Sequence, residues 1–146
     1  ASASASSIQF VVEGPDAPIW VMGDSTKLLQ VAINLTANAL RHTPPGGMVT
    51  IRAERLADSS SRLTVTDTGI GIAKENLARV LDPFVQVNAR PTDQQGSAGL
   101  GLPLAKRIAE LHGGTLAISS VPGSGTTVSI ALPAGRAIRQ APDRQA

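Results

Sequence analysis

The segment QVAINLTANALRHTPPGG, residues 30–47, combines a helical pattern with an abrupt stop. Because an α-helix turns about 100° per residue, Asn38 lies about 40° from Asn34 on one side and Arg41 about 20° on the other. Asparagine is a weak helix former, since its amide competes for backbone hydrogen bonds, so two on one face are unexpected. The proline and glycine pairs that follow force the chain to turn. The segment therefore predicts a helix with a narrow polar stripe.

The rest of this helix is apolar over a wide arc. Measured from Asn34, seven residues fall between about 60° and 240°, namely Val31, Leu35, Leu28, Ala39, Ala32, Leu29 and Leu40. We expect this arc to pack on a sheet, while Gln30 and Lys27 extend the polar stripe. One interpretation of the stripe is a solvated face, although Glu, Lys and Gln are better helix formers there. The other is a ligand site, since amide oxygens suit Mg²⁺ and Arg41 suits a phosphate.

Composition indicates one globular domain. The chain has 146 residues, of which 42% are hydrophobic and 16% charged, with a net charge of +2, which is enough for a core. The basic residues are dispersed and aromatic residues are scarce, so we expect no nucleic-acid binding. The absence of cysteine excludes disulfides, thiolate zinc sites and cysteine nucleophiles, and fits a reducing compartment. No apolar run approaches the roughly 20 residues of a membrane span, so we expect a soluble domain.

Hydrophobic periodicity predicts an alternation of strands and helices. Strands are expected at residues 8–12, 19–22, 48–55, 63–66, 115–120 and 126–132. A helix is expected from the N-cap Asp24 to about Arg41, a short helical piece near residues 75–81, and another helix at residues 100–111. The sequence His112-Gly113-Gly114 is typical of a left-handed helix end. Because the order lacks strict βαβ alternation, we expect an α+β fold, a two-layer sandwich.

The domain is predicted to span residues 7–133. Residues 1–6 are interpreted as a linker or an expression remnant, and residues 134–146 as a flexible tail or linker. The stretch that ends near residue 98 has little periodicity and many turn formers. Long irregular segments inside compact domains are usually functional, so we interpret residues 84–98 as a mobile lid.

Two glycine-rich loops suggest a nucleotide. DTGIGI, residues 67–72, follows a predicted strand; its glycines either make a turn or let a flat ligand approach while Asp67 accepts a hydrogen bond from its amino group. Such a carboxylate would favour adenine over guanine. GSAGLGLPLAKR, residues 96–107, leads into a helix whose N-terminus can bind phosphate. Neither loop matches the dinucleotide fingerprint or the Walker motif.

Together these segments resemble the catalytic ATP-binding domain of sensor histidine kinases, in the superfamily of the Hsp90, gyrase and MutL ATPases. Residues 30–47 resemble the N box, DTGIGI the G1 box, LDPFVQ the F box, GSAGLGL the G2 box and GSGTTVSI the final glycine box. The resemblance runs in order from about Val21 to Leu132. It implies a Bergerat-type two-layer α/β sandwich. A mixed sheet of about five strands would pack against three helices, and ATP would bind between the helices under a mobile lid.

The resemblance also implies roles for individual residues. Asn38 is the expected principal Mg²⁺ ligand with Asn34 beside it, and Arg41 a phosphate contact, so these three residues are the expected catalytic group. His42 would lie near the adenine. The remaining expected ATP contacts are Asp67, Gly69, Gly71, Ile72 and Thr126 around the adenine, and Gly99, Leu100, Gly101 and Leu102 along the phosphates.

The chain departs from the family pattern in two boxes. Ser97 takes the place of the first glycine in the G2 box. The F box keeps Phe84 but lacks the basic residue often found close by, which leaves Arg90 as the candidate lid cation for the γ-phosphate.

The absence of a catalytic base at position 34 favours transfer of the ATP phosphate to a protein over hydrolysis of ATP. Related ATPases carry a glutamate at the position of Asn34, and an amide cannot accept a proton at neutral pH. Neither His42 nor His112 is followed by the family's phosphoacceptor motif, so the acceptor histidine is expected on an upstream dimerisation domain. The fragment itself is not expected to autophosphorylate.

The resemblance further implies a response regulator partner and a monomeric isolated domain. It implies a homodimeric full-length protein and a cytoplasmic location, with an inner-membrane anchor as an option for the parent protein.

Two alternatives remain open at this point. An anti-sigma-factor-type serine kinase of the same superfamily would act on a partner protein, and the residues upstream of Ala1 would discriminate it. A non-catalytic nucleotide-binding docking module is the other, although Asn38, Asp67 and the glycine boxes argue against it.

Overall fold

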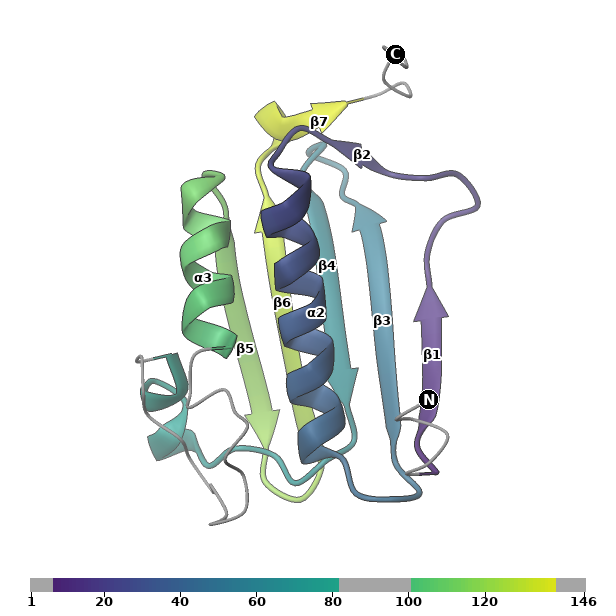
Figure 1. Cartoon of the computed structure of the whole chain (residues 1–146), viewed down its shortest axis with the longest axis vertical. Coiled ribbons are helices and arrows are strands. Elements are labelled where there is room, and N and C mark those ends of the chain that lie inside the picture. Colours follow the sequence, from purple (N-terminus) through teal and green to yellow (C-terminus); the bar gives the residue numbers. More distant parts are fainter. Residues whose placement is uncertain (1–6, 82–100, 139–146) are drawn as a thin grey trace.

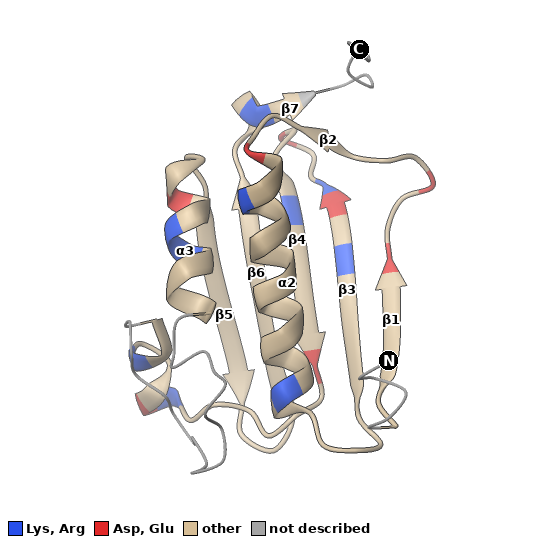
Figure 2. Ribbon diagram, in the orientation of Figure 1, with Lys and Arg blue, Asp and Glu red and all other residues tan. Residues whose placement is uncertain are grey.

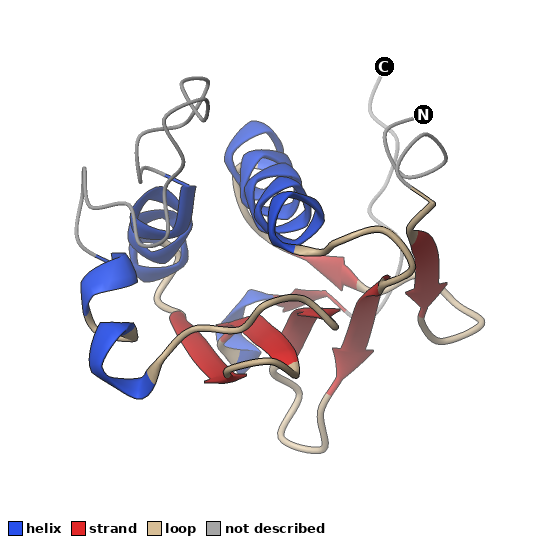
Figure 3. Ribbon diagram, turned by 90° about the horizontal axis from the view of Figure 1, so that it is seen from below, coloured by secondary structure: helices blue, strands red, loops and turns tan. Residues whose placement is uncertain are grey.

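A five-stranded sheet carries helices on one of its faces (Figure 1, Figure 3). The computed structural model describes residues 7–81 and 101–138. The five strands follow the order β1-β3-β4-β6-β5, and they are β1 (Gln9–Glu13), β3 (Met48–Arg55), β4 (Ser61–Asp67), β5 (Thr115–Val121) and β6 (Gly125–Leu132). β1 pairs in parallel with β3, and the other neighbours are antiparallel. The predicted two-layer sandwich with a mixed five-stranded sheet is therefore confirmed.

The sheet separates an apolar face from a polar one. In the strand register Ile51 faces Val65 and Val65 faces Val128, so alternate residues of β3, β4 and β6 line one face. The α-helices α2 (Ser25–His42) and α3 (Gly101–Leu111) pack on this face. The largest fully buried side chains come from both layers and are Leu35, Ile108, Val31 and Val49. Each contributes about 1.5–3 kcal/mol of burial free energy.

Helix α2 begins and ends through local hydrogen bonds. The backbone N–H of Lys27 donates to Oδ1 of Asp24 at 3.0 Å, which confirms the predicted N-cap. At the other end, Oγ1 of Thr43 donates to the carbonyl of Ala39 at 2.6 Å. Both ends of the helix are therefore specified by residues close in sequence.

The apolar arc of α2 is buried along only part of its width. Val31, Leu35 and Ala39 are buried, but Leu29 is 61% exposed. The prediction that the whole arc packs on the sheet is therefore wrong for Leu29, which lies at one edge of the arc. The sheet covers α2 from below and α3 lies beside it (Figure 3). Leu29 lies about 100° around the helix from Leu28, which packs against the core, so it points away from that layer.

The end of α3 has the predicted left-handed cap. Gly113 has φ +78, and the N–H of Gly114 donates to the carbonyl of Ala109 at 2.8 Å. The short helix expected near residues 75–81 is present as two 3₁₀ turns, η1 (Lys74–Asn76) and η2 (Arg79–Leu81). The described helices do not combine the length and apolarity that a bilayer crossing needs.

The ordered domain continues past the predicted boundary at residue 133. A 3₁₀ turn, η3 (Ala134–Arg136), leads into strand β7 (Ala137–Ile138), which pairs antiparallel with β2 (Trp20–Val21). The N–H of Met22 donates to the carbonyl of Arg136 at 2.7 Å. The interpretation of residues 134–138 as a flexible tail is therefore corrected. The strand expected at residues 19–22 is present as β2, whereas β7 has only two residues, too few for periodicity to reveal, and its partner is distant in the chain.

Candidate functional site

Asp67 is a buried carboxylate at the end of β4. It is 5% exposed, and its Oδ1 accepts hydrogen bonds from the N–H of Gly69 at 2.8 Å and of Thr126 at 3.3 Å. Burial raises the pKa of the Asp67 carboxyl, opposed by these two donors and by the charge of His42. Burying a carboxylate is costly, and here the hydrogen bonds offset only part of that cost. Such groups are often found at functional sites in proteins.

The G1 loop, residues 67–72, is clamped between two other segments. The N–H of Ile70 donates to the carbonyl of His42 at 3.2 Å, and the carbonyl of Ile70 accepts from the N–H of Gly123 at 2.8 Å. A Cβ on Gly69 would lie 2.1 Å from the carbonyl oxygen of His42. A Cβ on Gly71, which has φ +75, would lie 2.3 Å from the carbonyl oxygen of Val121. These glycines therefore allow the protein's own backbone segments to approach closely, a packing role that the sequence did not reveal.

Ser120 is a site residue that sequence reasoning missed. Its Oγ accepts the N–H of Ile72 at 2.7 Å and donates to the carbonyl of Gly125 at 2.8 Å. It also lies 2.8 Å from Oγ1 of Thr126. One signal was present in the sequence, because Ser120 continues the inward alternation of Leu116 and Ile118 with a polar group. A polar residue at such a position needs a partner.

The polar stripe of α2 ends close to this loop. Asn34 and Asn38 are half-buried, Arg41 is exposed, and His42 is the last residue of the helix. The carbonyl of His42 holds the G1 loop, so the stripe and Asp67 belong to the same end of the domain. Lys and Arg lie on several separate elements of the ribbon (Figure 2).

The donor set of this end suits Mg²⁺. Within residues 7–81 and 101–138 no group of three His, Cys, Asp or Glu side chains could hold a metal. The oxygen atoms that the stripe offers near the loop are the amide oxygens of Asn34 and Asn38, both half-buried. Mg²⁺ is commonly held by one or two protein oxygens together with phosphates and water, so these residues fit it.

The phosphate side of the predicted site is described only in part. Gly101 and Leu102 form the first turn of α3, where Leu102 is buried in the core. The other predicted residues of this side lie outside the described residues, namely Gly99, Leu100, Phe84 and Arg90, together with the proposed lid at residues 84–98.

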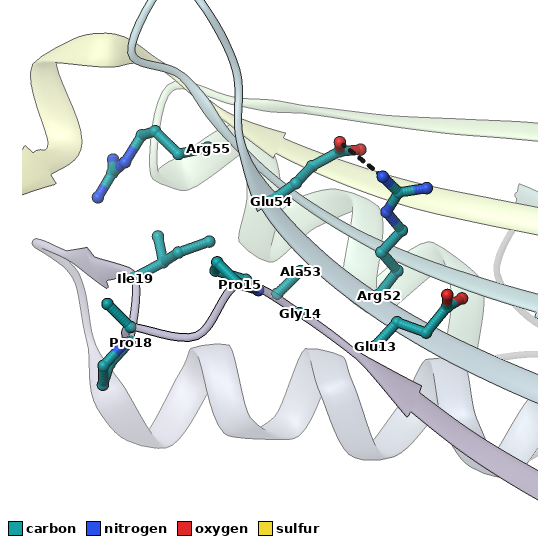
Figure 4. A pocket seen from close by; sticks show the side chains of 10 residues that line it. Glu13, Gly14, Pro15, Pro18, Ile19, Arg52, Ala53, Glu54 and Arg55 are labelled. Atoms are coloured by element: carbon teal, nitrogen blue, oxygen red, sulfur yellow. Dashed lines mark ion pairs between the residues drawn. The ribbon is translucent and has the colours of Figure 1, made fainter.

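A separate hollow of about 690 Å³ lies at the far end of the sheet (Figure 4). The loop after β1 and the last residues of β3 line it, whereas Asp67 pairs with Val49 near the first residue of β3. Arg52 and Glu54 form an ion pair of 3.7 Å there, and Arg55 donates to the carbonyl of Trp20 at 2.7 Å. The hollow contains none of the predicted site residues.

Residues 23–136 match the family described as histidine kinase-, DNA gyrase B- and HSP90-like ATPases. Because this match covers most of the chain, the chain belongs to that family, and the predicted family is confirmed. Membership of this family agrees with the two-layer fold and with the buried Asp67 carboxylate beside the glycine loop.

Several relatives of this chain carry the names of histidine kinases. The chain is 42% identical over 134 residues to the Non-motile and phage-resistance protein of Caulobacter vibrioides, covering 90% of this chain and 16% of that protein. It is 36% identical over 127 residues to Sensor histidine kinase WalK of Bacillus subtilis, covering 86% and 21%. With Histidine protein kinase DivJ of Caulobacter vibrioides it shares 42% over 119 residues, covering 82% and 20%. The chain thus spans about a fifth of the length of these relatives.

Solved structures share the same architecture. Full-length ShkA in complex with AMPPNP superimposes with a TM-score of 0.80 and 29% identity, covering 98% of this chain and 28% of that one. The mycobacterial sensor histidine kinase MprB gives a TM-score of 0.77 and 30% identity, covering 90% and 88%. The fold of this chain is therefore that of a histidine kinase catalytic domain.

Proposed function

We propose that this domain binds ATP with Mg²⁺ and donates the γ-phosphate to a histidine on an upstream dimerisation domain of its parent protein. The observation that carries this proposal is the buried Asp67 carboxylate, held by the G1 loop beside the helix that bears Asn38. The kinase names of the relatives and the AMPPNP complex of ShkA support it.

The adenine end of the proposed site is built around Asp67. Its carboxylate would accept a hydrogen bond from the exocyclic amine of adenine, next to Thr126, Gly69, Gly71 and Ile72. A purine with a carbonyl at that position would face the same carboxylate and be repelled. His42 would lie beside the base, since its carbonyl already contacts the loop.

The phosphate end would depend on the polar stripe and on the start of α3. Asn38 and Asn34 would hold Mg²⁺, which neutralises phosphate charge when bound. Arg41 would contact a phosphate. The N-terminal N–H groups of α3, at Gly101 and Leu102, favour an anion, because the positive end of the helix dipole lies there.

The residue at position 34 favours transfer to a protein. An asparagine amide has no basic site at neutral pH, so it cannot activate water as a carboxylate would. Phosphoryl transfer needs mainly positioning and charge neutralisation, which the remaining groups supply. The acceptor histidine would lie in the part of the parent protein that precedes this domain, and a response regulator would receive the phosphate next. We propose a monomeric domain within a homodimeric, cytoplasmically active parent.

A transfer assay tests this proposal. The domain is mixed with Mg²⁺, γ-labelled ATP below saturation and the histidine-bearing segment of the parent protein, with Asp67→Asn as the control of weakened ATP binding. Acid-labile, base-stable label on the upstream segment is the expected result. Acid-stable label on a serine would point to a serine kinase, and nucleotide binding without transfer would point to a docking module; either would overturn the proposal.

A further inference from the structure

We propose that Ser120 is a positioning residue that sets the preference for adenine by orienting the hydroxyl of Thr126. This inference rests on the proposed nucleotide site. Ser120 lies on β5, outside the glycine boxes. Its hydroxyl joins the G1 loop, at Ile72, to the first two residues of β6, Gly125 and Thr126.

All three contacts of the Ser120 hydroxyl can be hydrogen bonds at once in only one arrangement of hydrogens. The N–H of Ile72 can only donate, so Oγ of Ser120 accepts at 2.7 Å. The carbonyl of Gly125 can only accept, so the single hydrogen of Ser120 goes to it at 2.8 Å. The remaining contact, to Oγ1 of Thr126 at 2.8 Å, is then a hydrogen bond only if Thr126 donates.

This arrangement makes the Thr126 hydroxyl an acceptor toward the ligand. Its hydrogen is used by Ser120, so only its lone pairs remain available. Thr126 lies opposite Asp67 in the β4–β6 register, and its N–H donates to Asp67 at 3.3 Å. The Asp67 carboxylate and the Thr126 hydroxyl, which share a face of the sheet because the two residues are register partners, are therefore both acceptors. They match an amino group, which carries two hydrogens, and disfavour a carbonyl oxygen.

Removal of the Ser120 hydroxyl should relax this selectivity. A hydroxyl without a fixed partner rotates to suit its neighbour, so Thr126 could then donate to a carbonyl. Ile72 would also lose its acceptor, which loosens the G1 loop and weakens every purine ligand to a similar extent. The orientation effect therefore appears in the ratio of two affinities, whereas the loosening of the loop appears in both affinities equally.

The test compares ATP with ITP, which carries a carbonyl where adenine has its amino group. Calorimetry with Mg²⁺ gives both dissociation constants for the wild-type domain and for Ser120→Ala, Ser120→Thr and Ser119→Ala. Ser119 is the matched control, because it lies on the same strand but faces the other side of the sheet. The ITP-to-ATP ratio of dissociation constants should fall about tenfold in Ser120→Ala. It should stay unchanged in Ser119→Ala and be largely restored in Ser120→Thr.

A double-mutant cycle with Thr126→Val isolates the orientation effect. Without the Thr126 hydroxyl, Ser120→Ala should no longer alter the ratio. A tenfold change that persists in the Thr126→Val background would overturn the proposal, as would an unchanged ratio in Ser120→Ala. If Ser120→Ala does not fold, Ser120→Cys takes its place with the same expected fall. Failure of the wild-type domain to bind ATP would instead contradict the proposed function.

Discussion

Nε2 of His112 accepts a hydrogen bond of 3.1 Å from the backbone N–H of Asp24, which joins the end of α3 to the start of α2. The other ring nitrogen, Nδ1, lies 2.9 Å from the carbonyl of Ile108. A carbonyl only accepts, so Nδ1 carries the hydrogen and the ring is the neutral Nδ1–H tautomer. The two helices of the candidate site are thereby fixed to each other at their far ends.

Replacement of His112 should destabilise the fold. His112→Ala removes a 6% exposed ring and leaves its two hydrogen-bonding partners without it, so we expect the free energy of unfolding to fall by about 2–3 kcal/mol. Chemical denaturation measures this loss, and Glu110→Ala, on the exposed side of the same helix, is the control. Equal stabilities of the two variants would contradict the role of His112, and ¹⁵N chemical shifts of the ring check the tautomer independently.

Substitutions of Gly123 and Gly125 distinguish the cost of backbone strain from the cost of a close contact. Gly123 has φ +82, and a Cβ added to it would meet nothing within 4 Å, whereas Gly125 has φ +127 and its Cβ would lie 2.0 Å from the carbonyl oxygen of Asp67. We expect Gly123→Ala to cost about 1–2 kcal/mol of unfolding free energy from its backbone conformation alone. Gly125→Ala should cost clearly more and also weaken ATP binding, because it displaces Asp67. Thermal unfolding and calorimetry measure both effects, and similar losses in the two variants would refute the close contact.

Asp67→Asn should weaken ATP binding by about 10- to 100-fold, the range for a hydrogen bond to a charged group. Calorimetry with ATP and Mg²⁺ measures this loss.

The same variant also tests whether burial of the Asp67 charge destabilises the folded state. Since burial raises the folded-state pKa of Asp67 above its ordinary value of 3.8, the folded state binds the proton more tightly than the unfolded state. Wild-type stability relative to Asp67→Asn should therefore fall as the pH rises from about 3.8 through the raised pKa, and stay lower above it. Denaturation from pH 3 to pH 7 checks this, and a difference that does not vary with pH would disprove it.

Asn38→Ala should abolish the Mg²⁺ dependence of nucleotide affinity, because it removes the expected amide ligand. Titrations of an ATP analogue with and without Mg²⁺ measure this dependence. Gln30→Ala is the matched control, since Gln30 lies on the same polar stripe two turns earlier and is exposed. Loss of the Mg²⁺ effect in both variants, or in neither, would argue against Asn38 as the ligand.

Much of the fold was predictable because its signals are local. Asp24 caps a helix whose buried residues recur at Val31, Leu35 and Ala39, and Gly113 ends the second helix, all within a few residues of the positions they specify. The exposure of Leu29 was not predictable, since it depends on how far the neighbouring elements cover α2. The pairing of β7 with β2 was missed for a related reason, because two-residue strands become stable only through a distant partner.

The sequence by itself determined the element types and the glycine loops, since each depends on residue types at short spacing. Only the tertiary structure decided what surrounds the Asp67 carboxylate. Ile72 and Ser120 are 48 residues apart, and Asp67 and Thr126 are 59 apart, so these contacts exist only once the strands pair in register. The alternating pattern and the turns favour a register, but which strands become neighbours is decided only when the layers pack. The hydrogen-bonded group around Asp67 therefore follows from the fold.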